Sequence, residues 1–168
     1  HIDLHNNLFE AMLRIDYANL LNHMSRPEES IEQNKQAVYL LESMEEERLR
    51  GISNAVLFNT YYTMHNYSEA IGYGKEALKL FRRLNMDSYE GRVLIIIAEA
   101  YCKIGNFEDM HKYIEQAEPI VTRLNIMFLL GKINYFKSEA ALEANRIVDA
   151  EEHLDASIEC YDLSENQI

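Results

Sequence analysis

Residues 97–117 read IAEAYCKIGNFEDMHKYIEQA, and this stretch indicates two helices joined by a short turn. Apolar residues recur every three or four positions on both sides of Gly105 and Asn106, a spacing typical of amphipathic helices. Gly105 supplies a left-handed residue that ends the first helix, and Asn106 can cap the second. The stretch therefore predicts a helical hairpin.

The same pattern recurs every 40 residues along the chain. The segments that would begin the second helix of each copy match at 27–31, 67–71, 107–111 and 147–151. Three further columns keep their character at this spacing: small in Ala37, Ala77, Ala117 and Ser157; apolar in Leu41, Phe81, Val121 and Tyr161; glycine or alanine in Ala11, Gly51, Gly91 and Gly131. A fixed period of this length is the signature of a repeat architecture.

The period predicts an all-α chain made of four helical hairpins. We expect one repeat domain over residues 1–168, with copies at about 8–46, 47–86, 87–126 and 127–165. The helices are expected near 8–23, 28–44, 47–64, 67–84, 88–103, 107–124, 127–143 and 147–162. Residues 1–7 are interpreted as the tail of a preceding repeat, so the chain is expected to be a fragment of a larger protein.

Composition excludes several classes of function. The chain has 168 residues and a formal net charge of -12, and a field of that sign repels phosphate backbones and anionic membranes. Two cysteines are too few for a disulfide framework, and the longest apolar run is far shorter than a membrane span. We therefore expect no nucleic-acid partner and no membrane contact, and a cytoplasmic protein, with the periplasm as the alternative.

Catalytic patterns are missing from the sequence. No histidine belongs to an H-E-x-x-H motif or to a Cys-His cluster of metal spacing, and the lone E-x-x-H of Glu108 and His111 is interpreted as a surface pair. No Ser, His and Asp form a recognisable nucleophile arrangement. The one Gly-x-Gly, at residues 72–74, lies inside an expected helix, where small residues would let a neighbouring helix approach. The sequence predicts neither an enzyme nor a cofactor or metal site.

The motif residues resemble the tetratricopeptide repeat family. They are Tyr61, Asn66, Tyr67, Ala70 and Ala77 in the second copy and Tyr101, Gly105, Asn106, Phe107 and Ala117 in the third. The 40-residue unit is longer than the usual 34 and looks like the repeats of bacterial signalling and regulatory proteins. This resemblance implies a right-handed α-solenoid of about four hairpins and eight helices, with the first helix of each hairpin lining a concave groove.

By the same resemblance, ligands would contact particular columns of the first helices. One of these columns is polar in all four copies, at Asn19, Asn59, Glu99 and Glu139. The full set of expected groove residues is Asn19, Asn22, Asn59, Tyr62, Arg92, Glu99, Lys103, Tyr135 and Glu139. Another column, which holds Lys in the clamp for chaperone tails, here holds Ile15, Ala55, Ile95 and Tyr135, which favours a partly apolar peptide of mixed charge instead.

The sequence thus favours a non-catalytic module that binds a protein or peptide segment in its groove and scaffolds or senses a signal. The alternative is a homo-oligomerisation module. Leu154, Ile158 and Tyr161 form an apolar stripe on the last expected helix, and such a stripe could pair two copies of the chain.

Overall fold

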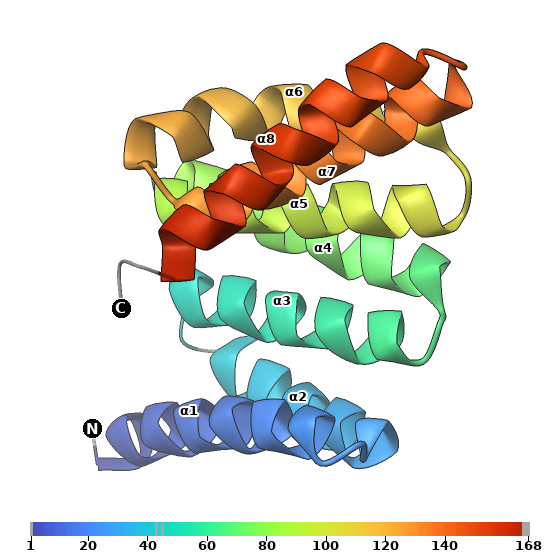
Figure 1. Cartoon of the computed structure of the whole chain (residues 1–168). Helices are drawn as coiled ribbons and strands as arrows, with labels where there is room; N and C mark the ends of the chain where they lie inside the picture. Colours follow the sequence, from blue (N-terminus) through green and yellow to red (C-terminus); the bar gives the residue numbers. More distant parts are fainter. Residues whose placement is uncertain (1, 43, 45, 166–168) are drawn as a thin grey trace. The chain divides into compact units, whose positions relative to one another are not determined.

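The computed structural model describes residues 2–42, 44 and 46–165, and these residues form helices and turns without any strand. The helices, labelled in Figure 1, are α1 (Ile2–His23), α2 (Pro27–Glu42), α3 (Glu47–Thr63), α4 (Tyr67–Arg83), α5 (Asp87–Lys103), α6 (Phe107–Leu124), α7 (Met127–Glu143) and α8 (Ile147–Glu165). They pair as four hairpins, so the all-α fold class expected from the period is confirmed.

One expected boundary is wrong. The helix α1 begins at Ile2 instead of near residue 8, so residues 2–7 belong to the first helix and are not a separate tail. The physical reason is that this segment contains neither Gly nor Pro, the residues that most strongly end a helix. The other helices begin and end within a few residues of their expected positions.

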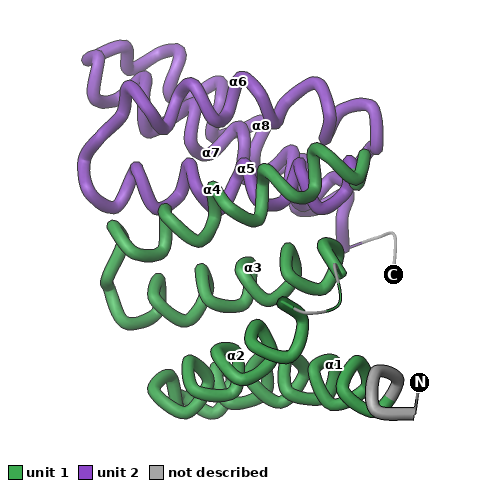
Figure 2. The backbone as a smooth tube through the Cα atoms, turned by 180° about the vertical axis from the view of Figure 1, so that it is seen from behind, with its two compact units in different colours: residues 1–86 green, residues 87–168 purple. Residues whose placement is uncertain are grey.

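The chain forms two compact units, coloured separately in Figure 2. The first ends at Met86 and contains the hairpins α1–α2 and α3–α4; the second begins at Asp87 and contains α5–α6 and α7–α8. The boundary coincides with the expected end of the second repeat. A single domain over residues 1–168 stays a prediction.

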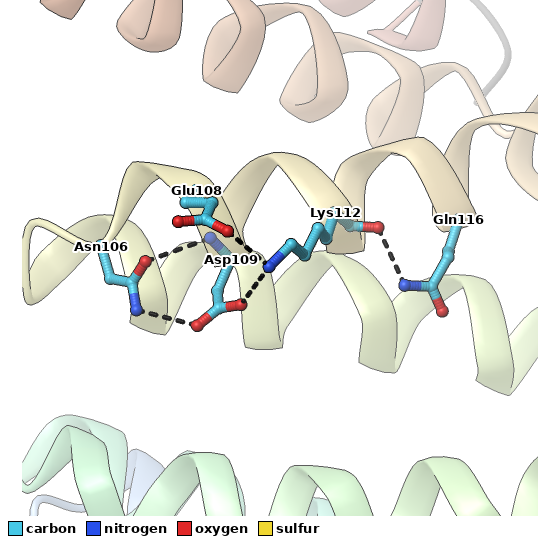
Figure 3. A network of polar contacts seen from close by, with 5 residues as sticks. All are labelled: Asn106, Glu108, Asp109, Lys112 and Gln116. Atoms are coloured by element: carbon cyan, nitrogen blue, oxygen red, sulfur yellow. Dashed lines mark hydrogen bonds and ion pairs between the residues drawn. The ribbon is translucent and has the colours of Figure 1, made fainter.

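Turns within the hairpins repeat with the same period. Left-handed backbone occurs at Ser25, His65, Gly105 and Asn145, each 40 residues after the last. The Asn106 side chain accepts a hydrogen bond from the Asp109 backbone N–H at 3.1 Å, which confirms the predicted turn and cap. Figure 3 shows this cap and the Lys112 ammonium, which bonds the Glu108 and Asp109 carboxylates at 2.8 and 3.3 Å.

The glycine column lies where the two helices of a hairpin approach most closely. A Cβ atom added to Gly51 would lie 2.8 Å from Cε1 of Phe81, and one added to Gly131 would lie 3.0 Å from Cε1 of Tyr161. At both glycines the second helix of the same hairpin therefore lies close to the first. The close approach expected for residues 72–74 is wrong at Gly72, where an added Cβ would meet no heavy atom within 4 Å; this glycine lies on the exposed side of α4.

Stacked tyrosines join the helices of the two central hairpins. The rings of Tyr61 and Tyr73 stack with centroids 5.3 Å apart, and those of Tyr101 and Tyr113 stack at 5.5 Å. The two pairs are equivalent under the 40-residue period. Offset stacks of this kind stabilise a hairpin beyond the area they bury.

A buried polar network joins three helices of unit 1. The Thr60 hydroxyl on α3 contacts the Asn22 amide of α1 at 2.8 Å and the Ser30 hydroxyl of α2 at 3.1 Å. Asn34 on α2 accepts a hydrogen bond from the Ser53 hydroxyl at 3.0 Å and donates to the Ser30 carbonyl at 3.3 Å. Because these groups satisfy one another, they can be buried at little cost.

Candidate functional site

A hollow of about 500 Å³ opens in unit 2 between the first helices of its two hairpins. Helices α5 and α7 supply most of its wall, and α6 and α8 add one aromatic residue each. The lining residues are Glu99, Cys102, Lys103, Phe107, Lys132, Tyr135, Phe136, Glu139 and Tyr161. Four of the nine groove residues expected from the sequence therefore meet in one place: Glu99, Lys103, Tyr135 and Glu139.

One wall of the hollow is aromatic. Tyr161 of α8 lies over Gly131 and meets the Phe128 ring edge-on, with centroids 5.6 Å apart. Tyr135 is 41% exposed and meets the ring of Phe136 edge-on at 5.4 Å. The glycine at position 131 explains why the Tyr161 ring can lie so close to α7, since any larger residue would push it away.

An ion pair crosses the hollow from α5 to α7. The Lys132 ammonium lies 2.8 Å from a Glu99 carboxylate oxygen, and both side chains are about three-quarters buried. The same ammonium lies 5.9 Å from the centroid of the Phe128 ring, within the range of a cation–π contact. Lys132 is therefore held by a carboxylate and an aromatic face together.

Three weakly acidic groups in the hollow have raised pKa values. Burial raises the pKa of the Cys102 thiol, and the Glu139 carboxylate raises it further by more than Lys103 lowers it. Burial, followed by Glu139, raises the pKa of Tyr135, and burial, followed by Glu99, raises that of Tyr161. Cys102 is therefore a poor nucleophile at neutral pH, and carboxylates dominate the local electrostatics.

The other expected groove residues lie outside this hollow. Arg92, Asn19 and Asn59 are exposed on α5, α1 and α3. Asn22 bonds Thr60 within unit 1, and Tyr62 stacks on Phe58 with centroids 5.8 Å apart. These two residues have structural partners, so truncating either one would also loosen unit 1.

The column of Ile15, Ala55, Ile95 and Tyr135 was expected to face a peptide, and this expectation is wrong in two of the four copies. Ile15 and Ile95 are buried, with exposed fractions of 3% and 0%, so they are core residues and offer no surface to a ligand. Tyr135, in the same column, does line the hollow. An equal position in the repeat therefore predicts which side of its helix a residue lies on. It does not predict whether a neighbouring helix covers that residue.

Sequence reasoning missed the aromatic contributions of Phe107, Phe136 and Tyr161 to the site. Tyr161 was assigned to a dimer contact, but its ring packs within its own hairpin. A signal for the contact of Tyr161 with Gly131 was present in the sequence. In each copy the apolar residue stands 30 positions after the glycine or alanine, so Tyr161 is to Gly131 as Phe81 is to Gly51.

Neither a group of metal ligands nor a membrane-spanning helix occurs among the described residues. Within residues 2–42, 44 and 46–165, no three His, Cys, Asp or Glu side chains are grouped so that they could hold a metal ion. No helix in this part of the chain has the length and apolar character needed to cross a membrane.

Comparison with known proteins identifies the fold. No family model and no curated protein sequence matches the chain. Among solved structures, aspartyl phosphate phosphatase F from Bacillus subtilis superimposes on 95% of the chain with a TM-score of 0.86 and 15% identity. A STAND-class signal transduction ATPase with a tetratricopeptide repeat sensor, from Pyrococcus horikoshii, covers 96% with a TM-score of 0.85 and 17% identity. The chain has the tetratricopeptide repeat fold.

A third structure agrees with this assignment. The tetratricopeptide repeat domain of Arabidopsis FLU covers 71% of the chain with a TM-score of 0.64 and 21% identity, and the match includes 98% of that domain. The chain spans only 42% of the length of the Bacillus protein and 25% of that of the Pyrococcus protein. The tetratricopeptide repeat resemblance inferred from Tyr101, Gly105 and Phe107 is confirmed at the level of fold.

Proposed function

We propose that the chain is a non-catalytic protein- or peptide-binding module of a signalling or regulatory protein. One observation carries the proposal: four residues expected to contact a ligand gather in the hollow between α5 and α7. The hollow combines exposed aromatic surface with charged groups, a mixture typical of recognition sites. Two structural neighbours, a sensor-bearing signal transduction ATPase and an aspartyl phosphate phosphatase, support a place in signalling.

We expect Tyr135→Ala to weaken peptide binding by about tenfold or more, because truncating an exposed aromatic anchor commonly costs over 1 kcal/mol of binding free energy. Peptides would be selected on the purified chain from a random displayed library and their affinities measured by calorimetry. Tyr39→Ala is the matched control, since Tyr39 is 76% exposed on α2, a second helix. Failure to select any peptide, or equal loss of affinity in both variants, would contradict the proposal.

Self-association is the second candidate, and the way that successive hairpins pack favours it. Where α2 meets α3, Asn34 contacts Ser53, and where α6 meets α7, Glu118 contacts Lys137. Such contacts define the face by which the second helix of one hairpin packs on the first helix of the next.

The corresponding faces of α1 and α8 are exposed. In the repeat register, Leu154 of α8 corresponds to Asn34, and Leu13 of α1 corresponds to Ser53. Both reference residues are fully buried, whereas Leu154 is 45% and Leu13 is 52% exposed. Packing α8 of one copy on α1 of a second copy would cover both leucines with the geometry already used inside each unit.

Head-to-tail packing of this kind joins copies into open chains or rings, so we expect a weight-average mass that rises with concentration in light scattering. Leu13→Glu and Leu154→Glu should each hold the chain as a monomer, while an equimolar mixture of the two variants should form dimers and nothing larger. Tyr39→Glu is the control for an exposed charge on another face. A mass that stays monomeric at every concentration rules this candidate out.

A further inference from the structure

The hollow in unit 2 contains one carboxylate with a cationic partner and one without. Glu99 pairs with Lys132. Glu139, 40 residues later in the same column, forms no ion pair with a Lys, Arg or His of the described ranges 2–42, 44 and 46–165. After burial, its negative charge is the largest cause of the raised pKa of the Tyr135 hydroxyl. Helix α7 therefore presents a half-buried negative charge beside an exposed phenol ring.

The surroundings of Lys132 show that a carboxylate and an aromatic ring together hold a cation in this hollow. The Lys132 ammonium contacts the Glu99 carboxylate and lies within cation–π distance of the Phe128 ring. A carboxylate beside an aromatic face stabilises a cation through a charge-assisted hydrogen bond and the ring quadrupole. Glu139 and Tyr135 offer the same two groups, with space for a side chain in front of them.

The charges around this space favour a cation over an anion. Lys132 is neutralised by Glu99, and Lys103 is exposed, so solvent screens its charge more than that of half-buried Glu139. At the Cys102 sulfur the effect of Glu139 exceeds that of Lys103. The net charge of -12 adds a long-range attraction for basic ligands.

We infer that the hollow between α5 and α7 binds an arginine or lysine side chain of a peptide ligand, with Glu139 as counter-ion and Tyr135 and Tyr161 as aromatic walls. This inference rests on the proposed peptide-binding function and adds the chemistry of the residue that is recognised. Arginine fits best, because its planar guanidinium can stack on a phenol ring while it donates two hydrogen bonds to one carboxylate.

The test uses the peptide acetyl-Ala-Ala-Arg-Ala-Ala-amide and two relatives with citrulline or glutamate in place of arginine. Citrulline keeps the shape of the side chain and removes its charge. Binding would be followed by the NMR shifts of the Tyr135 and Tyr161 rings, assigned with the corresponding Tyr→Phe variants. We expect the arginine peptide to bind about tenfold more tightly than the citrulline peptide, and the glutamate peptide to cause no shift.

Glu139→Gln should weaken the arginine peptide about tenfold and leave the citrulline peptide unchanged. Glu143→Gln is the matched control, because it removes one exposed carboxylate from the same helix outside the hollow and gives the same net charge. A measurement without ligand checks the geometry: Glu139→Gln should lower the pKa of the Cys102 thiol and so speed its alkylation by iodoacetamide, whereas Glu143→Gln should not.

Two results would overturn the inference. One is equal affinity for the arginine and citrulline peptides, and the other is an identical effect of Glu139→Gln and Glu143→Gln. If library selection yields peptides that depend on Tyr135 but lack arginine and lysine, the cation site is wrong and the peptide-binding function stands. If no peptide of any composition binds, the proposed function fails with it.

Discussion

Replacing Gly51 with alanine is expected to lower the free energy of unfolding of the chain by about 2 kcal/mol, the usual range for forcing extra volume into a packed site. The new Cβ would lie 2.8 Å from Phe81 Cε1 and 3.2 Å from the neighbouring ring carbons Cδ1 and Cζ. Phe81 has no exposed surface, so its ring cannot turn away into solvent. Urea denaturation followed by circular dichroism would measure the loss.

The control is the same substitution at Gly72. Because an added Cβ meets nothing there, Gly72→Ala should raise the free energy of unfolding by about 0.5–1 kcal/mol through the higher helix propensity of alanine. The two variants differ by the same single methyl group and should have effects of opposite sign. If Gly51→Ala also stabilised the chain, the close contact between α3 and α4 would be contradicted.

The first hairpin indicates how the Gly51 variant could be rescued. At the equivalent positions it has Ala11 and Leu41, both fully buried in one apolar cluster, so an alanine is accommodated where the facing residue is leucine. In a Phe81→Leu background, Gly51→Ala should therefore cost much less than in the natural chain. A double-mutant cycle measures this coupling directly.

The sequence predicts the repeat and its turns well because those features are local. Helical spacing, Gly105 and Asn106 determine where each helix ends, and the 40-residue period carries that information to the other copies. The columns of Gly51 and Phe81 were also visible, but not that they touch. That contact depends on the distance between two helices, which no single helix encodes.

The candidate site could be predicted only in part, for a related reason. Comparison of equivalent repeat positions identifies the face of the first helices that holds Glu99, Tyr135 and Glu139, because residues at equal repeat positions point the same way. This comparison does not reveal which residues other helices cover. It therefore placed Ile95 on the surface, although Ile95 is buried in the structure. It also cannot see Tyr161, which reaches the hollow from a second helix.

Coverage by neighbouring helices also hid the polar network of unit 1. Asn34 stands in a column that holds glycine, isoleucine and leucine in the other copies, and a polar residue there looks like one facing solvent. The structure buries it completely, with Ser53 and Ser30 as partners. Asn34 is thus a position in unit 1 where an added charge should be costly.

Asn34→Asp is expected to lower the free energy of unfolding at pH 7 by about 3 kcal/mol, because it places an uncompensated charge in the core. The Ser53 hydroxyl can still donate to one carboxylate oxygen, but the other oxygen would face the Ser30 carbonyl that now accepts the Asn34 amide. Only a protonated carboxyl can donate to that carbonyl. The folded state should therefore raise the pKa of this Asp above its unfolded value of about 3.9.

The sign of the pH dependence follows from that shift. A folded state that holds the proton more tightly than the unfolded state loses stability as pH rises, here by about 1.4 kcal/mol per pH unit from about pH 4 up to the folded pKa. Urea denaturation should therefore show little difference between Asn34→Asp and the natural chain near pH 4 and the full loss at pH 7. Asn19→Asp, exposed on α1, is the control and should change stability by under about 0.5 kcal/mol at both pH values. A loss at Asn34 that did not vary with pH would mean that the carboxylate finds a solvated position, and the buried network around Thr60 would then be the wrong description of unit 1.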